Sequence, residues 1–115
     1  MRWHGTLEYK RAFSIFRAMP YPSRPQTKEF QEWGSELLSL DTHVAGYAER
    51  VDSGELCAHD IPKLEALACQ VGTLRDTLAA VPAPTDRDVQ LKEEYRTYVE
   101  TLHRMMAHLL RLAAE

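Results

Sequence analysis

The chain of 115 residues has few cysteines, and their spacing excludes the usual structural uses of cysteine. Cys57 and Cys69 lie twelve positions apart, which matches no structural zinc pattern. On one helix they would be ~18 Å apart, whereas a disulfide requires Cα atoms within ~7 Å. We therefore expect two reduced thiols in a reducing compartment.

The sequence also lacks a long hydrophobic run. No stretch approaches the ~20 apolar residues that a membrane-spanning helix needs. The first twenty residues contain no apolar core of a secretory signal, because charged and polar groups interrupt every short apolar run. These interrupting residues are Arg2, His4, Glu8, Lys10, Arg11 and Arg17. We therefore expect a cytoplasmic protein without membrane contact, and the excess of Arg over Lys hints at a GC-rich bacterial genome.

Acidic residues are nearly absent from the first 28 positions. This segment has six basic residues and one acid, whereas residues 29–115 have eight basic residues and sixteen acids. The imbalance indicates that the basic segment lies on its own acidic body or on that of a second copy. The first twenty residues are amphipathic and nearly free of acids, which also fits a mitochondrial transit peptide. Nucleic-acid binding is disfavoured, because six scattered bases make a poor phosphate track and the acidic body would repel the backbone.

Glycine and proline are missing from the last stretch of the chain, which carries the strongest helical signal. Thr85 stands at an N-cap position, and Asp86 and Asp88 follow in the first turn, where carboxylates suit the helix dipole. From there to the end, the apolar residues cover a helix face about 160° wide, more than a two-stranded coiled coil uses. We expect a helix from Asp86 to Ala114 that touches at least two other elements.

Two further helices are predicted upstream. One begins between Pro25 and Thr27 and ends at Asp52-Ser53-Gly54, with apolar residues alternating at threes and fours. The next begins between Ala58 and Ile61, with Asp60 as its cap, and ends before Val81. Because the connections are short, neighbouring helices should run antiparallel. The sequence thus predicts an all-α fold, an antiparallel three-helix bundle (up-down-up) formed by residues 25–115.

Residues 1–24 form a basic, aromatic-rich N-terminal arm with a proline linker. The periodicity of the arm fits a short helix opening near Thr6, and it also fits a strand broken at Arg11. We favour the helix, which can pack as a fourth helix, since a lone strand is unstable. Its large apolar side chains need a cover, so we expect an interface there. The predicted interface residues are Trp3, Leu7, Tyr9, Phe13, Phe16 and Met19.

Residues able to bind a metal do not form a convincing set. Glu100 and His103 have the Glu-x-x-His spacing of di-metal bundles, but the helical wheel places both outside the apolar face, and a second such motif is missing. His103 and His108 are five apart and cannot chelate from one helix face. We therefore predict no catalytic residue, no metal site and no cofactor.

Two charged residues interrupt the apolar stripes of the second and third helices. Asp41 and Arg75 each lie about 40° from the centre of their stripe, and antiparallel packing puts them at nearly the same level. We predict an Asp41–Arg75 ion pair that sets the register of the two helices. In the alternative, Arg75 reaches solvent and Asp41 bonds elsewhere.

These patterns favour a non-catalytic helical-bundle module that mediates protein–protein interaction and self-associates as a homo-oligomer through its arm. The alternative is a bundle that binds a small molecule or a metal, including an enzyme.

Overall fold

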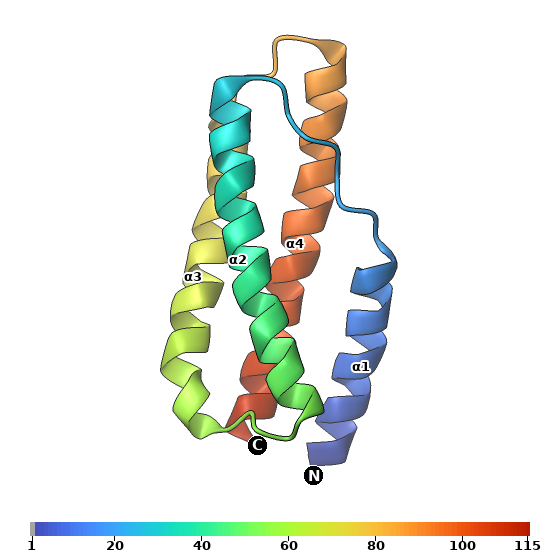
Figure 1. The fold of residues 1–115 in the computed structure, drawn as a ribbon, viewed down its shortest axis with the longest axis vertical. Helices are drawn as coiled ribbons and strands as arrows, with labels where there is room; N and C mark the ends of the chain where they lie inside the picture. Colours follow the sequence, from blue (N-terminus) through green and yellow to red (C-terminus); the bar gives the residue numbers. More distant parts are fainter. Residues whose placement is uncertain (1) are drawn as a thin grey trace.

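The computed structural model describes the backbone of residues 2–115 and the side chains of residues 7–115. In this part of the chain all regular structure is helical, and four α-helices pack compactly (Figure 1). The elements are α1 (Arg2–Ala18), α2 (Lys28–Asp52), η1 (Ala58–Asp60), α3 (Ile61–Thr77), η2 (Leu78–Ala80) and α4 (Asp86–Ala114). The prediction of an all-helical fold is confirmed, and the arm forms a helix rather than a strand.

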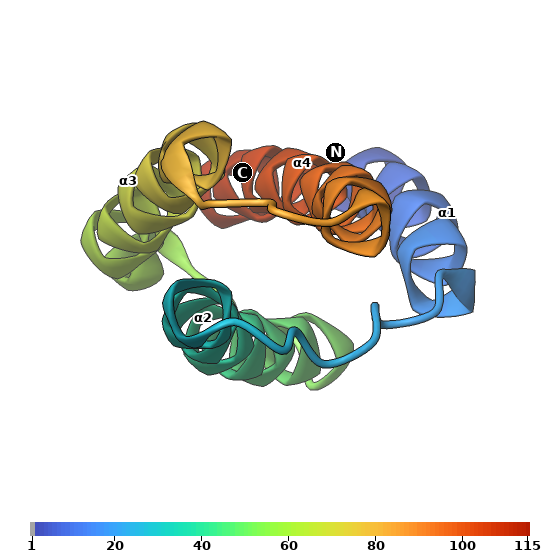
Figure 2. The same cartoon turned by 90° about the horizontal axis from the view of Figure 1, so that it is seen from above.

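The helix α4 is the centre of the fold. It contacts α1, α2 and α3, as the width of its apolar face predicts. Seen from above, α3, α4 and α1 form one curved row, and α2 lies across from that row (Figure 2). Both α1 and α2 contact α4. The helix α1 makes its main contacts with α4 and few with α2.

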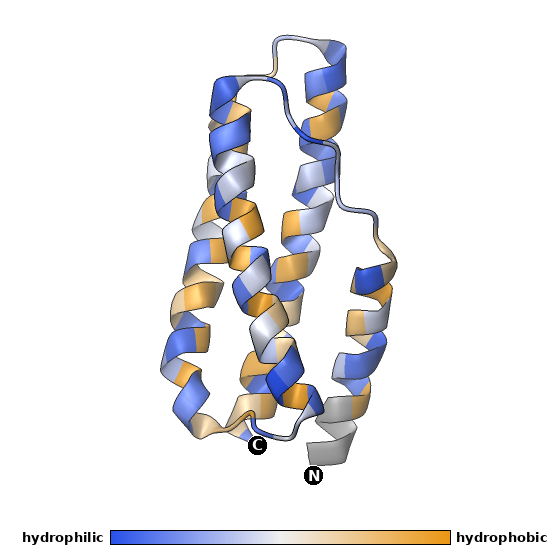
Figure 3. Ribbon diagram, viewed as in Figure 1, coloured by the Kyte–Doolittle hydropathy of each residue, from blue (hydrophilic) through white to orange (hydrophobic). Residues whose placement is uncertain are grey.

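Apolar side chains form one continuous core. Hydrophobic and hydrophilic positions alternate along the described helices (Figure 3), so each long helix turns an apolar stripe inward. Val99, Leu102, Met106 and Leu109 of α4 are completely buried, and Leu37 and Leu64 meet them from α2 and α3. Asp88 is the one buried charged residue in the described part, and it belongs to the first turn of α4.

Local signals place the ends of the helices. Thr85 caps α4, since its Oγ1 accepts a hydrogen bond from the Asp88 N–H at 3.1 Å and its own N–H donates to Asp88 Oδ2 at 3.3 Å. At the end of α2, Gly54 has a φ of 75°, a left-handed conformation that costs glycine little. The predicted cap at Thr85 and the predicted stop at Asp52-Ser53-Gly54 are both confirmed.

Two polar contacts hold α3 against α2. The Trp33 indole N–H donates to the carbonyl oxygen of Leu74 at 2.8 Å in a buried contact. At the other end, Asp60 Oδ2 accepts from the Cys57 N–H at 3.0 Å and from the Arg50 guanidinium at 3.1 Å. These hydrogen bonds lower the pKa of Asp60, so its carboxylate stays charged and connects the end of α2 to the start of α3.

Aromatic packing docks α1 onto α4. Tyr9 is only 1% exposed and stacks on Phe13 with ring centroids 5.4 Å apart, while Phe16 is buried against Tyr98 at 5.1 Å. Among the described side chains, one ion pair joins α1 to the rest of the molecule, Glu8 to Arg111 at 2.9 Å. It uses the single acid of the basic arm and a base of the acidic body, the reverse of the expected charge match. Apolar burial therefore dominates the docking of α1.

Replacing Tyr9 with Phe should raise stability. The buried Tyr9 hydroxyl has no hydrogen-bond partner in the described structure, and an unsatisfied buried hydroxyl costs about 1–3 kcal/mol. We expect Tyr9→Phe to increase the free energy of unfolding by about 1 kcal/mol, measured by urea denaturation. Tyr98→Phe is the matched control, since the Tyr98 hydroxyl donates to Asp41 at 3.1 Å and its loss should destabilise. If Tyr9→Phe lowers the free energy of unfolding as much as Tyr98→Phe does, this expectation is contradicted.

None of the described helices is both long and apolar enough to cross a membrane.

Candidate binding cleft

Two hollows separate α2 from α1 and its linker. Each hollow is also lined by a tyrosine of α4. The first, the linker hollow, has a volume of about 390 Å³, and the second, the α1 hollow, about 250 Å³. Tyr21 connects them, because its ring packs edge-on against Tyr95 of the linker hollow at 6.0 Å and against Tyr98 of the α1 hollow at 5.0 Å. We call the two hollows together the α1–α2 cleft.

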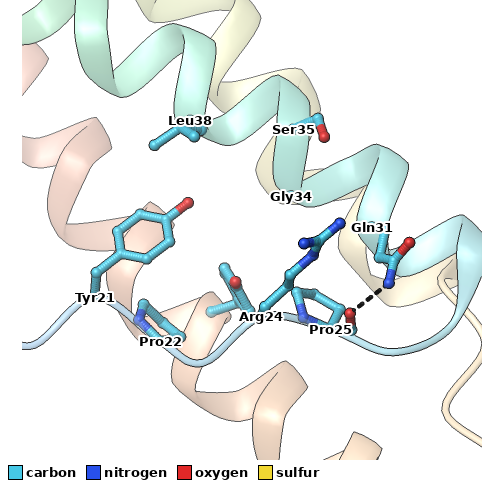
Figure 4. A pocket seen from close by; sticks show the side chains of 9 residues that line it. Tyr21, Pro22, Arg24, Pro25, Gln31, Gly34, Ser35 and Leu38 are labelled. Carbon is cyan, nitrogen blue, oxygen red and sulfur yellow. Dashed lines mark hydrogen bonds between the residues drawn. The ribbon is translucent and has the colours of Figure 1, made fainter.

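The linker hollow is formed where the proline-rich segment crosses α2 (Figure 4). Prolines hold the segment extended, so its carbonyl groups lack the partners that a helix would give them. Side chains supply these partners: Gln31 Nε2 donates to the Pro25 oxygen at 2.9 Å, and the Tyr95 hydroxyl donates to the Ser23 oxygen at 3.0 Å. The linker is thus fixed in place as one wall of the cleft.

Gly34 lies in the opposite wall of the linker hollow. A Cβ at this position would lie 3.8 Å from Pro25 Cγ, which is an ordinary van der Waals distance. Glycine is therefore not needed there for a close helix crossing, although it leaves the wall of the hollow without a side chain.

The α1 hollow combines aromatic rings with one carboxylate. Its lining residues are Phe13, Phe16, Arg17, Met19, Asp41, Val44, Ala45 and Tyr98. Asp41 is half-buried, and its Oδ2 accepts the hydrogen bond from Tyr98. The Arg17 guanidinium lies 5.0 Å from the centroid of the Phe13 ring, a cation–π arrangement. The hollow thus presents a negative charge beside aromatic faces.

Burial changes the protonation of the groups in the cleft. It raises the pKa of Asp41 above its ordinary value of 3.8, and the hydrogen bond from Tyr98 opposes that rise. Burial, the neighbouring Tyr95 and Asp41 together raise the pKa of Tyr21 to about 12. Burial and Asp41 also raise the pKa of Tyr98. Both phenols are therefore neutral near pH 7, and Tyr98 donates its hydroxyl proton to Asp41.

The structure does not bring Asp41 and Arg75 together. Asp41 faces α1 and α4 and bonds to Tyr98, whereas Arg75 forms an ion pair with Asp76 at 3.2 Å and lies 3.4 Å from His103 Nδ1. The expected pair therefore needs correction. Both residues flank their apolar stripes, but Asp41 lies on the flank turned toward α1, and Arg75 on the flank turned toward α4.

The residues considered for metal binding stay apart. Glu100 pairs with Arg96 at 3.1 Å, and His103 is half-buried in the contact between α3 and α4 rather than directed outward. A Cβ on Gly72 would lie 3.4 Å from His103 Nε2, so the imidazole packs directly over this glycine. Among the described residues, no group of three or more His, Cys, Asp or Glu side chains is placed to hold a metal ion.

The predicted interface residues of the arm divide into three groups. Tyr9 and Phe16 are buried by this chain's own helices, so they cannot form a surface for a partner in this conformation. Phe13 and Met19 are partly buried and line the α1 hollow, and Leu7 is 50% exposed. The side chain of Trp3 lies outside the described residues.

Tyr95 and Tyr98 belong to the wide apolar face that the sequence predicts for the last helix, but the sequence analysis does not identify them as parts of a site. The available signal was the combination of two tyrosines three positions apart with an acid inside an apolar stripe, Asp41. Only the fold adds Tyr21 to them, since the linker is far from α4 in the sequence.

The effect of Asp41 on stability should depend on pH. Because its pKa is raised by folding, the stability that its protonated form contributes is fully present below the ordinary value of 3.8 and is lost as the pH rises through the folded-state pKa. We expect Asp41→Asn to be more stable than the wild type at pH 7 and equally stable near pH 3. Urea denaturation at both pH values measures the difference in free energy of unfolding between Asp41→Asn and the wild type. The same difference at pH 3 and pH 7 would contradict this prediction.

The geometry of the cleft is the basis for assigning a function, since comparisons with protein-family models, with curated proteins and with solved structures find no match to this chain.

Proposed function

We propose that this chain is a non-catalytic binding module that mediates protein–protein interaction through the α1–α2 cleft. Its architecture is an antiparallel three-helix bundle of α2, α3 and α4, running up-down-up, with α1 packed as a fourth helix. Figure 1 supports this description, because the sequence colours run in opposite directions along successive helices.

One observation carries the proposal: α1 and α2 both rest on α4, yet an aromatic-lined cleft separates them. Tyr21 and Leu38 are exposed at this cleft, and Leu38 is 55% exposed. Aromatic and apolar side chains around a depression are typical of the residues that dominate binding at protein interfaces. A helix or an extended segment of a partner can lie in such a groove.

A second copy of the chain is the first partner to test. Leu7 and Ile15 are 50% and 64% exposed on α1, and together with the cleft they give the molecule more than one apolar surface that a second copy can cover. In such an oligomer, the arm keeps its predicted role in self-association. The contacting residues are then on the exposed side of α1, instead of the buried Tyr9 and Phe16.

Sedimentation equilibrium of the native chain over a concentration series tests the proposal. We expect an oligomer, and we expect Leu38→Ser to weaken association at least about tenfold, as loss of a central apolar contact does. Val89→Ser is the matched control, because Val89 is 53% exposed but lies on α4 outside the cleft. A monomer at every concentration, or equal effects of both substitutions, would contradict self-association through the cleft.

The size of the linker hollow favours a second candidate function, the binding of a small molecule. Its volume of about 390 Å³ falls within the range of ligand pockets, and it combines apolar walls with a few polar groups. Native mass spectrometry of the purified chain distinguishes the two candidate functions. A stoichiometric small adduct would support small-molecule binding.

A further inference from the structure

We propose that the α1 hollow is a binding site for an alkylammonium group, with Asp41 as the counter-charge and the rings of Phe13, Phe16 and Tyr98, which line the hollow, as its aromatic surroundings. The ammonium group belongs either to a free amine or to a lysine side chain. The site does not depend on the proposed protein partner, because the chain itself supplies all of its residues.

The first argument is that Asp41 lacks a cationic partner. Its carboxylate lies on the apolar side of α2 and accepts one hydrogen bond, from the neutral Tyr98 hydroxyl. No basic side chain in the described part forms an ion pair with it. Burying a charge without a partner is costly, and the raised pKa of Asp41 reflects that cost. A bound cation would remove this cost.

The second argument is the arrangement of the rings. Phe16 and Tyr21 both contact the Tyr98 ring, with centroids 5.1 and 5.0 Å away and interplanar angles of 48° and 72°. Phe16 and Tyr98 line the α1 hollow together with Asp41, and Tyr21 adjoins the hollow through its contact with the Tyr98 ring. A cation within about 6 Å of a ring centroid is attracted to the negative face of the ring. Aromatic rings with a carboxylate are therefore the chemistry that recognises primary and quaternary ammonium groups.

Arg17 makes a cation–π contact at the edge of this hollow, where its guanidinium lies over the Phe13 ring. It is exposed and forms no ion pair with Asp41, so it leaves the carboxylate free for a ligand. As a neighbouring positive charge, however, Arg17 should repel a second cation.

Size and polarity restrict the ligand further. A hollow of about 250 Å³ accepts a short stem beside Met19 and Val44, but not a large ring system. Asp41 repels anions. A neutral alcohol of the same length would gain only the apolar contacts of the stem. The predicted order of affinity is therefore alkylammonium above alcohol, and alcohol above carboxylate.

Isothermal titration of the full chain with hexylammonium, hexyltrimethylammonium and 1-hexanol tests the proposal. We expect both cations to bind at least about tenfold more tightly than hexanol. Capped lysine, with blocked amino and carboxyl termini, identifies the source: binding equal to that of hexylammonium points to a peptide side chain, and much weaker binding points to a free amine. Either result supports the site if it requires Asp41.

Asp41→Asn should reduce the affinity for both cations about tenfold and leave hexanol binding unchanged. Asp76→Asn is the control, because it makes the same change in net charge at an exposed carboxylate of α3. Arg17→Gln should increase the affinity for the cations, a gain that a misfolded variant cannot produce.

The proposal is overturned if neither cation binds at concentrations on the order of 10 mM. It is also overturned if hexanol binds as tightly as the cations, or if Asp41→Asn and Asp76→Asn have equal effects. Because these titrations need no protein partner, they can fail while self-association holds, and the reverse is also possible.

Discussion

Deletion of residues 1–24 should leave a chain that no longer folds stably. The deletion removes α1 and uncovers the side of α4 on which α1 lies. Tyr9 and Phe16 are buried side chains, and burying each contributes about 1.5–3 kcal/mol, to which Phe13 and Met19 add smaller amounts. The total is comparable with the 5–15 kcal/mol that stabilises a whole domain. Circular dichroism should therefore find loss of the cooperative thermal transition, and light scattering should find aggregation.

A double substitution on the exposed side of α1 is the control for this deletion. Leu7→Ser with Ile15→Ser changes two largely exposed residues and should alter the free energy of unfolding by less than about 1 kcal/mol in the monomer. If the truncated chain keeps the melting temperature, mass and solubility of the full chain, then α1 is not part of the core.

Replacing Leu102 with Ala should cause a large loss of stability. Leu102 is 0% exposed and lies in the middle of α4, the helix that contacts each of the other three. Truncating a fully buried leucine removes its apolar contacts and leaves a cavity, which together cost about 2–5 kcal/mol. Urea denaturation should therefore give a lower midpoint with an unchanged slope.

Leu38→Ala provides the matched comparison for this substitution. It makes the same chemical change at a residue of α2 that is 55% exposed, and it should alter stability by no more than about 0.5 kcal/mol. A loss below about 1 kcal/mol in Leu102→Ala would mean that the core closes around the missing side chain, contrary to a rigidly packed α4.

The helices themselves could be predicted, because their signals are local. The Thr85 cap needs only Asp88 three positions later, and the end of α2 needs only a glycine that adopts a positive φ. The wide apolar face of α4 likewise predicts that α4 contacts several helices, whatever those helices are.

The partners of the charged residues could not be predicted in the same way. A helical wheel gives the angle of Asp41 from the centre of its stripe, but it does not tell which neighbouring helix lies on that flank. The charge imbalance likewise suggested that bases of the arm meet acids of the body. In the described structure the ion pair of α1 is instead Glu8 with Arg111, because apolar packing sets the position of α1 and the exposed charges follow.

The sequence by itself determined the helical elements, their ends and their apolar faces, since each depends on residues within a few positions of one another. The tertiary structure alone decided that Tyr9 and Phe16 are buried within this chain, and that Tyr21, Asp41 and Tyr98 meet in one cleft. These residues come from the arm, the linker and two helices far apart in the sequence. Their meeting depends on how whole helices pack against α4, which no local pattern of residues records.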